Sequence, residues 1–273
     1  MRSRAPRLIW RIWRRLARGA RLLLCLWPVF LTSSAALAQS GAVITAAEYA
    51  DPTTRYGHGV LGDAVEWGNL HVTVTRNYGK KGGLFQGHTS LTYHFKMPDE
   101  LVFEDLEPRL WDVTGDGAPE VVVVQSHRDL GARLLVIGLG ADGKPGYLGS
   151  TPHIGRTNRW LAPVGAADLD GDGRIEIAYI DRPHLAKLLR IWRFDGDDLR
   201  HVSDIPGLTN HKIGWDLIPG GIRDCGDGPE IITADARWQQ IVATRFAGGK
   251  AVKRAVAPYK SSQSFAGAMA CRQ

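Results

Sequence analysis

The feature that most constrains this chain is an acidic, glycine-containing segment that occurs three times at constant spacing. It begins at Asp112 (DVTGDGAPEVVVV), at Asp168 (DLDGDGRIEIAYI) and, two residues shorter, at Asp224 (DCGDGPEIIT), so that successive starts are 56 residues apart. A repeat of this length is typical of a supersecondary unit that buries its apolar surface by stacking against neighbouring copies. We therefore expect a chain built from stacked copies of one unit.

Each copy has the same order of apolar segments, with one before the acidic segment and three after it. In chain order they lie at 108–111, 120–124, 133–137 and 147–154; at 162–167, 176–180, 188–192 and 199–205; and at 218–222, 230–233, 240–244 and 251–257. Four short strands per unit, separated by Gly- and Asp-rich turns, predict an all-β fold and a small β-propeller. The alternatives are a parallel β-helix, which favours shorter repeats, and a Greek-key sandwich, which has no reason to repeat its sequence.

The N-terminal part of the chain lacks the acidic segment but still contains strand-like alternation, at 67–75 and 90–95. We expect one or more divergent N-terminal blades at 39–107. Three blades follow at 108–273, with closure at the C-terminal end. The roughly 235 residues after position 38 correspond to about four such units, with five blades as the alternative.

Residues 1–38 have the order of regions typical of a secretory signal peptide. Eight arginines and no acidic residue lie at 2–21, an apolar run follows at 22–31, and the small-residue pattern ALA ends at 38. A transmembrane anchor is the alternative, but Pro28 and the polar residues 32–34 keep the run short of the ~20 apolar residues that a spanning helix needs. We expect an exported protein, periplasmic or secreted, with no transmembrane segment after cleavage; the Sec and twin-arginine routes both stay open.

The basic charge of the chain belongs mainly to that segment. The whole sequence has 34 Lys and Arg against 28 Asp and Glu, and without the eight N-terminal arginines 26 basic residues face 28 acidic ones. The charge therefore gives no reason to expect nucleic acid as a partner. Two cysteines follow position 38, and we expect Cys225 and Cys271 to form one disulfide, with two free thiols as the alternative.

The acidic segments have the oxygen-rich pattern that calcium requires. Calcium takes 6–8 oxygen ligands, which a nine-residue loop can supply from positions 1, 3, 5 and 9, with a glycine at position 6 to allow the sharp turn. These side chains are Asp112, Thr114, Asp116 and Glu120 in the first loop, and Asp168, Asp170, Asp172 and Glu176 in the second. Asp224, Asp227 and Glu230 of the shortened third loop are weaker candidates.

Two other types of acidic loop are alternatives here. An EF-hand requires a glutamate at position 12 of its loop, where Val123 and Tyr179 stand. Plain Asp-Gly turns of β-hairpins are the other alternative. An acid at position 9, directly before a strand in two aligned loops, favours a metal site.

The first two segments, DVTGDGAPEVVVV and DLDGDGRIEIAYI, resemble the FG-GAP and VCBS repeats of integrin-like β-propellers, and the resemblance covers residues 108–257. It implies that each loop joins the first two strands of a blade and that the eight loop residues named above bind calcium. The chain lacks the Phe-Gly pair of the family name, and Gly165-Ala166-Ala167 only approximates its Gly-Ala-Pro. Because the family is functionally broad, the resemblance implies the fold and the metal more than any activity.

A fainter repeat lies at the predicted blade junctions. Its two copies are Asn158, Arg159 and Trp160, and Asn210, His211 and Lys212. These side chains could face a central funnel and bind a sugar or an anionic group; stabilising the junctions is the alternative.

No G-x-S-x-G or H-E-x-x-H motif is present in the sequence, so we predict no catalytic residue. We expect a calcium-binding interaction module for an unknown protein or glycan partner, and not an enzyme. The alternatives are a propeller enzyme acting on a carbohydrate or ester in the funnel, and a structural protein of the cell envelope.

Overall fold

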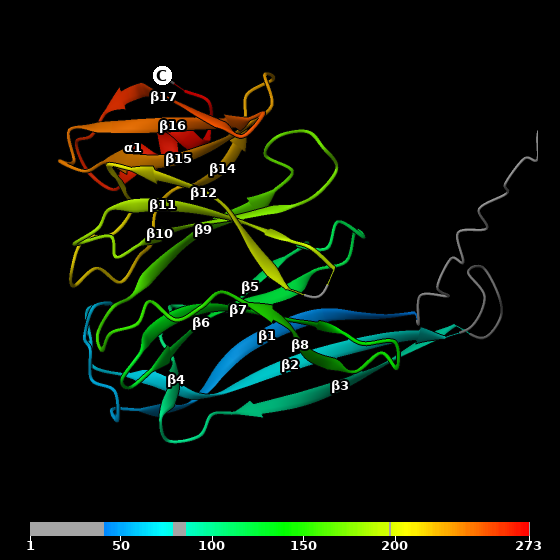
Figure 1. The fold of residues 1–273 in the computed structure, drawn as a ribbon. Helices are drawn as coiled ribbons and strands as arrows, with labels where there is room; N and C mark the ends of the chain where they lie inside the picture. Colours follow the sequence, from blue (N-terminus) through cyan, green and yellow to red (C-terminus); the bar gives the residue numbers. More distant parts are fainter. Residues whose placement is uncertain (1–40, 79–85, 197, 273) are drawn as a thin grey trace, which may run out of the picture. The chain divides into compact units, whose positions relative to one another are not determined.

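In a computed structural model, which describes residues 41–78, 86–196 and 198–272, the 56-residue repeat is an antiparallel β-meander. The middle copy consists of four strands in the order β12-β11-β10-β9, coloured green to yellow in Figure 1. They are β9 (Leu161–Ala167), β10 (Glu176–Asp181), β11 (Leu188–Phe194) and β12 (Leu199–Pro206). The predicted signal peptide, residues 1–38, lies outside the described residues.

The other two repeats have the same order of strands, but their first strand is interrupted. In the first repeat, β4 (Leu101–Phe103) and β5 (Arg109–Trp111) both pair with β6 (Glu120–His127), which is followed by β7 (Gly131–Leu139) and β8 (Pro145–Ser150). In the last, β13 (Leu208–Thr209) and β14 (Gly221–Asp224) both pair with β15 (Pro229–Asp235), followed by β16 (Gln240–Ala247) and β17 (Lys250–Pro258). The interrupting segments, 104–108 and 210–220, each contain a proline, which cannot donate a ladder hydrogen bond.

The N-terminal strands form a meander of their own: β1 (Ala42–Thr53), β2 (Glu66–Tyr78) and β3 (Gly87–Lys96). One pairing, between Trp67 of β2 and Phe103 of β4, joins them to the first repeat, so both lie in one eight-stranded sheet. The connection from β1 to β2 reaches the repeats, because Val60 O accepts a hydrogen bond of 3.0 Å from Gly214 N. Among the described pairings, β17 pairs with β16 alone. The all-β prediction is confirmed.

The core is shared between repeats. Residues 121–124 of β6 and 177–180 of β10 are buried on both faces of their sheets, which explains why these runs are continuously apolar. The largest apolar cluster contains Val122, Ile177 and Ile231, one from each repeat, and β9 contacts β7, β14 and β15. Gly165 of β9 permits this close packing, since a Cβ there would lie 2.9 Å from Ile222 Cδ1.

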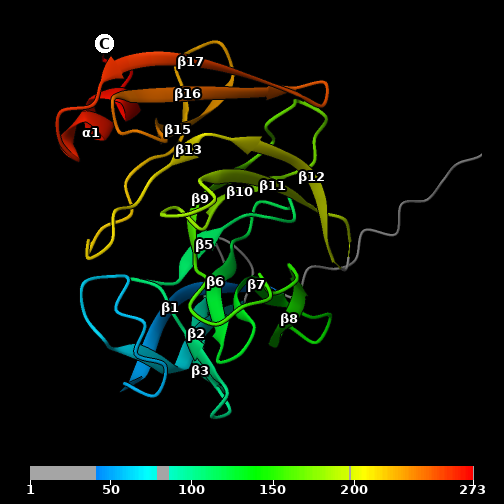
Figure 2. The same cartoon turned by 60° about the vertical axis from the view of Figure 1, so that its left-hand side comes forward.

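The C-terminal end carries a short helix that the sequence analysis did not predict, α1 (Gln263–Met269). Helix α1 lies beside β15 and β16 (Figure 2). Its residues Phe265 and Ala268 are buried in a cluster with residues of both strands. A disulfide joins Cys225, between β14 and β15, to Cys271, just after α1, as predicted. Among the described residues, no helix has the length and apolar character to span a membrane.

Candidate functional site

Both full-length acidic loops fold back onto their first aspartate. Asp168 accepts hydrogen bonds from Gly171 N (2.7 Å) and Gly173 N (2.9 Å), and Asp112 makes the same two bonds with Gly115 and Gly117. All four glycines have φ between 77° and 86°, a left-handed conformation that side chains with a Cβ rarely adopt. The repeated glycines of the sequence are therefore required by the turn.

The glutamate at position 9 ties each loop to the strand that follows it. Glu176 is the first residue of β10, and its carboxylate accepts a hydrogen bond of 2.9 Å from Leu169 N. Glu120 is the first residue of β6, and its carboxylate accepts a hydrogen bond of 2.8 Å from Val113 N. Burial raises the pKa of both glutamate carboxyls above the ordinary value of a glutamate. The hydrogen bonds from these N–H groups act in the opposite direction but do not cancel the effect of burial. Each glutamate thus closes its loop from a buried position.

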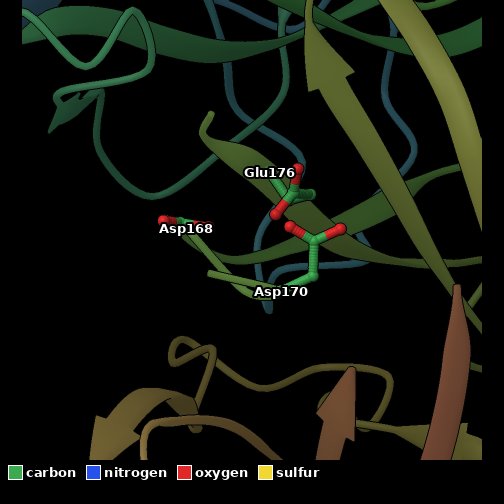
Figure 3. Close-up of side chains that lie close together, drawn as sticks. All are labelled: Asp168, Asp170 and Glu176. Carbon is green, nitrogen blue, oxygen red and sulfur yellow. The ribbon is translucent and has the colours of Figure 1, made fainter. Parts of the chain in front are cut away.

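The second loop gathers three acids. Carboxylate oxygens of Asp168, Asp170 and Glu176 lie within 4.8 Å of one another, and Figure 3 shows the carboxylates of Asp170 and Glu176 turned toward each other. Asp170 Oδ1 is buried and lacks a hydrogen-bond partner. Among the described residues, this is the one such group of three or more potential ligands. Clustered carboxylates with an unsatisfied oxygen fit a hard cation such as calcium.

The predicted ligand Asp172 forms ion pairs with two arginines of the same repeat. Its Oδ2 lies 2.8 Å from Arg174 Nη2 and 3.1 Å from Arg193 Nη1. The loop spacing predicts Asp172 as a ligand together with Asp168, Asp170 and Glu176. In the structure its carboxylate forms ion pairs and is outside the group of three converging acids, and its metal role stays a prediction.

Arg193 supplies a cation that the sequence analysis missed. It pairs across the hairpin with Glu176; its guanidinium hydrogen-bonds Glu176 Oε1 and lies 2.9 Å from Asp170 Oδ2. The guanidinium therefore neutralises part of the negative charge of the cluster, and leaves Asp170 Oδ1 unpartnered.

The first loop has a different interior. Thr114 Oγ1 donates a hydrogen bond of 3.3 Å to Glu120 Oε1, and Asp116 Oδ1 accepts a hydrogen bond of 2.8 Å from Ala118 N. On β7 the residue beside Glu120 is Gly138, which has no side chain that could supply a guanidinium. A Cβ at Gly138 would lie 2.9 Å from Glu120 Cγ. The described residues of this loop do not bring three carboxylate oxygens within 4.8 Å of one another, and its metal role stays a prediction.

In the third loop, arginines surround the glutamate. Glu230 lies 3.1 Å from Arg223 and 2.8 Å from Arg254. Against the raising effect of burial, these guanidinium groups hold the pKa of Glu230 below its usual value. Asp227 and Glu230 line a cavity of ≈ 490 Å³, while Asp224 Oδ1 caps the turn by accepting from two backbone amides. Arginines thus hold the position-9 carboxylate in this loop.

The two copies of the fainter junction repeat have different surroundings. Asn158, Arg159 and Trp160 line a cavity of ≈ 290 Å³. Asn210 and His211 are buried. Lys212 Nζ lies 4.7 Å from the ring centroids of both Trp238 and Tyr259, in contacts typical of cation–π pairs.

Three further polar residues line the smaller cavity and were not predicted as site residues: His58, Arg182 and His184. His184 Nε2 lies 3.0 Å from His211 Nδ1, which links the cavity wall to the second copy of the junction repeat. His58 lies far in the sequence from Arg182 and His184, and the three share no motif, so no sequence signal identified them.

Comparison with known families supports the repeat interpretation. Residues 112–179, from the first acidic loop to the strand after the second, match the model of the FG-GAP-like repeat. The comparison with curated proteins found no match to this chain. The chain carries an FG-GAP-like repeat over residues 112–179, as the two acidic segments predicted.

Proposed function

We propose that this chain is an exported, calcium-binding protein of the β-propeller type that acts as a binding module. The repeated four-stranded meanders pack against one another through β9, which supports the proposal that each meander is a propeller blade. The proposed propeller has four blades, with five as the alternative. A signal-like N-terminus and a disulfide both fit an oxidising compartment outside the cytoplasm, the periplasm or the medium.

One observation carries the metal proposal: the oxygens of Asp168, Asp170 and Glu176 converge, and Asp170 Oδ1 has no partner. Calcium fits this donor set, since it prefers carboxylate oxygens and tolerates irregular geometry. When bound, it would supply positive charge that ties the loop to β10. Its proposed role is to stabilise the repeat and not to act in a reaction.

Chelation tests the metal proposal directly. A metal that binds only the native state stabilises it by mass action, so excess EDTA is expected to lower the melting temperature, and calcium to restore it. Asp170→Asn should reduce the calcium-dependent shift to less than half, because the substitution removes a charged ligand. Asp99→Asn, at an exposed acid between β3 and β4, is the matched control. A melting temperature that EDTA leaves unchanged would exclude the stabilising metal.

The proposed role of the repeats is recognition of a protein or glycan, without catalysis. The acids of the loops are engaged in turns, ion pairs and the candidate metal cluster, which supports a scaffold over a paired-carboxylate hydrolase. A glycan array probed with the purified protein, with and without calcium, tests this role. Product formation from any array glycan would instead favour the enzyme.

A further inference from the structure

The cavity of ≈ 290 Å³ is formed where segments 58–60, 158–160 and 182–185 meet residue 213. Its polar lining consists of side chains that can donate hydrogen bonds, and none of the described residues that line it is acidic. The polar members are His58, Asn158, Arg159, Arg182 and His184. A concave site with a few convergent donors is typical of small-molecule binding.

Arg159 is the unpaired cation of this lining. Its Nη1 donates to the neighbouring Asn158 O at 3.0 Å, and no carboxylate of the described residues forms an ion pair with it. Arg182, in contrast, makes two bonds to Asp181, of 2.8 and 3.0 Å. Arg159 therefore leaves a positive charge available to a ligand.

His58 is held from behind by a buried carboxylate. His58 Nδ1 lies 2.5 Å from Glu104 Oε1, and the hydroxyl of Ser126 donates to Glu104 Oε2. Glu104 is only 2 % exposed, and both of its carboxylate oxygens have a hydrogen-bond partner. The other ring nitrogen, Nε2, has no hydrogen-bond partner among the described residues, and His58 lines the cavity.

The rim of the cavity is apolar. Leu185 and Ile213 are 63 % and 71 % exposed, and Val60 and Pro183 extend the apolar wall. Exposed large apolar side chains beside convergent donors suit a ligand that has both a polar head and an apolar body.

Two lining residues have a strained backbone. Asn158 and Arg182 have φ of 54° and 46°, in the left-handed region that favours glycine. Neighbours hold both: Asn158 N donates to Tyr56 Oη at 3.2 Å, and Arg182 N donates to Trp160 O at 2.9 Å. Strain that the surrounding structure maintains is concentrated at ligand sites in proteins.

We propose that this cavity binds a small organic anion. Its carboxylate or phosphate group contacts Arg159 and His58, and its apolar body lies against Leu185 and Ile213. The proposal goes beyond the calcium-stabilised module, and it does not depend on the metal loops, because no residue of those loops lines the cavity.

Titration with matched compounds tests this proposal. The purified protein, freed of calcium with chelator and then dialysed free of the chelator so that no other organic anion competes, is titrated with benzoate, phenyl phosphate, benzyl alcohol and acetate and observed by saturation-transfer NMR. We expect benzoate or phenyl phosphate to bind at least about ten-fold more tightly than the neutral alcohol, and acetate to bind more weakly than benzoate. The preference between the two aromatic anions identifies the head group.

Variants then locate the site. Arg159→Gln should weaken anion binding about ten-fold or more, and Ile213→Ser should weaken it about three-fold or more. Arg200→Gln changes an exposed arginine of β12 that pairs with Asp195, and should leave binding unchanged. Melting temperatures, measured in parallel, establish that each variant is folded.

Three results would overturn the proposal. One is equal binding of benzyl alcohol and benzoate. Another is unchanged anion affinity in folded Arg159→Gln. The third is no detectable binding of either aromatic anion at about 10 mM, a concentration that reveals even weak ligands.

Discussion

At the scale of single residues, Arg193 decides how the second acidic loop behaves without metal. Its guanidinium contacts Asp170, Asp172 and Glu176 and is 6 % exposed. A buried cation among three carboxylates reduces their mutual repulsion. The loop can therefore be folded before any metal binds, and a metal would add to an existing network.

Replacing Arg193 by Met should expose this dependence. Removing one partner of a buried ion-pair network typically costs about 3–5 kcal/mol, so the calcium-free protein should melt at a lower temperature. Because the carboxylates then lack their internal cation, added calcium should raise the melting temperature more than in the unmodified protein. Scanning fluorimetry in EDTA and in calcium measures both effects, with Arg200→Met as the exposed control. Equal calcium-free melting of the two variants would contradict the role given to Arg193.

His184 makes a second residue-scale prediction, on pH. Burial, followed by the neighbouring His211, His58 and Lys187, lowers the pKa of His184 from 6.5 to about 4. Arg182, two residues away, lines the same cavity. As the pH falls from 6.5 toward 4, the unfolded chain binds a proton at this histidine before the folded chain does. Its effect is therefore to reduce stability across that window.

Urea unfolding between pH 7.5 and 4.5 tests this sign. His184→Gln should lose less stability on acidification than the unmodified protein, because glutamine does not titrate. His88→Gln, at an exposed histidine of β3, should keep the original pH dependence. An identical slope for His184→Gln and the unmodified protein would show that another group is responsible.

At the scale of elements, the start of β7 positions the segment that lines the cavity. Gly131 has φ of 72°, and a Cβ there would contact Arg156 O and lie 2.8 Å from Arg159 O. The next residue, Ala132, donates its N–H to Arg159 O at 2.8 Å. Strand β7 and the 156–159 segment therefore pack closely through backbone atoms, and a backbone atom cannot avoid a clash by changing a side-chain rotamer.

Gly131→Ala should accordingly destabilise the protein by about 2–4 kcal/mol, since it combines left-handed strain with a backbone clash. Gly249 in the β16–β17 turn also has φ of 72°, but a Cβ there would meet nothing within 4 Å. Gly249→Ala is thus a matched control that isolates the strain alone, expected to cost about 1 kcal/mol. Chemical unfolding of both variants gives the difference. Equal losses would mean that the packing around Gly131 carries no cost.

At the scale of the whole molecule, the C-terminal end is fastened to the last repeat by several independent contacts. The disulfide holds Cys271 to the β14–β15 turn, and Arg223 donates to Ala268 O. Phe265 packs near Trp238 and Tyr259. Without these contacts, a seven-residue helix would not be stable in water.

Replacing both cysteines by serine should lower the free energy of unfolding by about 2–4 kcal/mol, because the bond closes a long loop in the unfolded chain. Reducing agent should lower the stability of the unmodified protein by a similar amount and leave the Cys225→Ser/Cys271→Ser variant unaffected. Mass spectrometry of peptides digested without reductant identifies the linked pair. A variant that unfolds at the same denaturant concentration as the oxidised protein would contradict a stabilising role.

Much of the repeat could be predicted because its signals are local. The apolar runs predicted at 176–180 and 188–192 are contained in β10 and β11. Asp-Gly pairs lie just before β10 and just after β11, so local turns limit these two ends. The approach of Asp168, Asp170 and Glu176 was equally accessible, since all three lie within nine residues of chain. Helix α1 was not predicted, because a short segment that contains Gly267 has little helical propensity of its own.

The sequence by itself determined the repeat, the glycine positions of its loops, the acids that converge in the second loop and the only two cysteines after residue 38. These features depend on contacts between near neighbours, or on the count of one residue type. The tertiary structure alone decided that the N-terminal strands share a sheet with the first repeat, that Arg193 faces Glu176, and that His58 meets Arg159 and His184 at one cavity. Those contacts join segments whose alignment depends on strand register and on the packing of sheets, which no local pattern encodes.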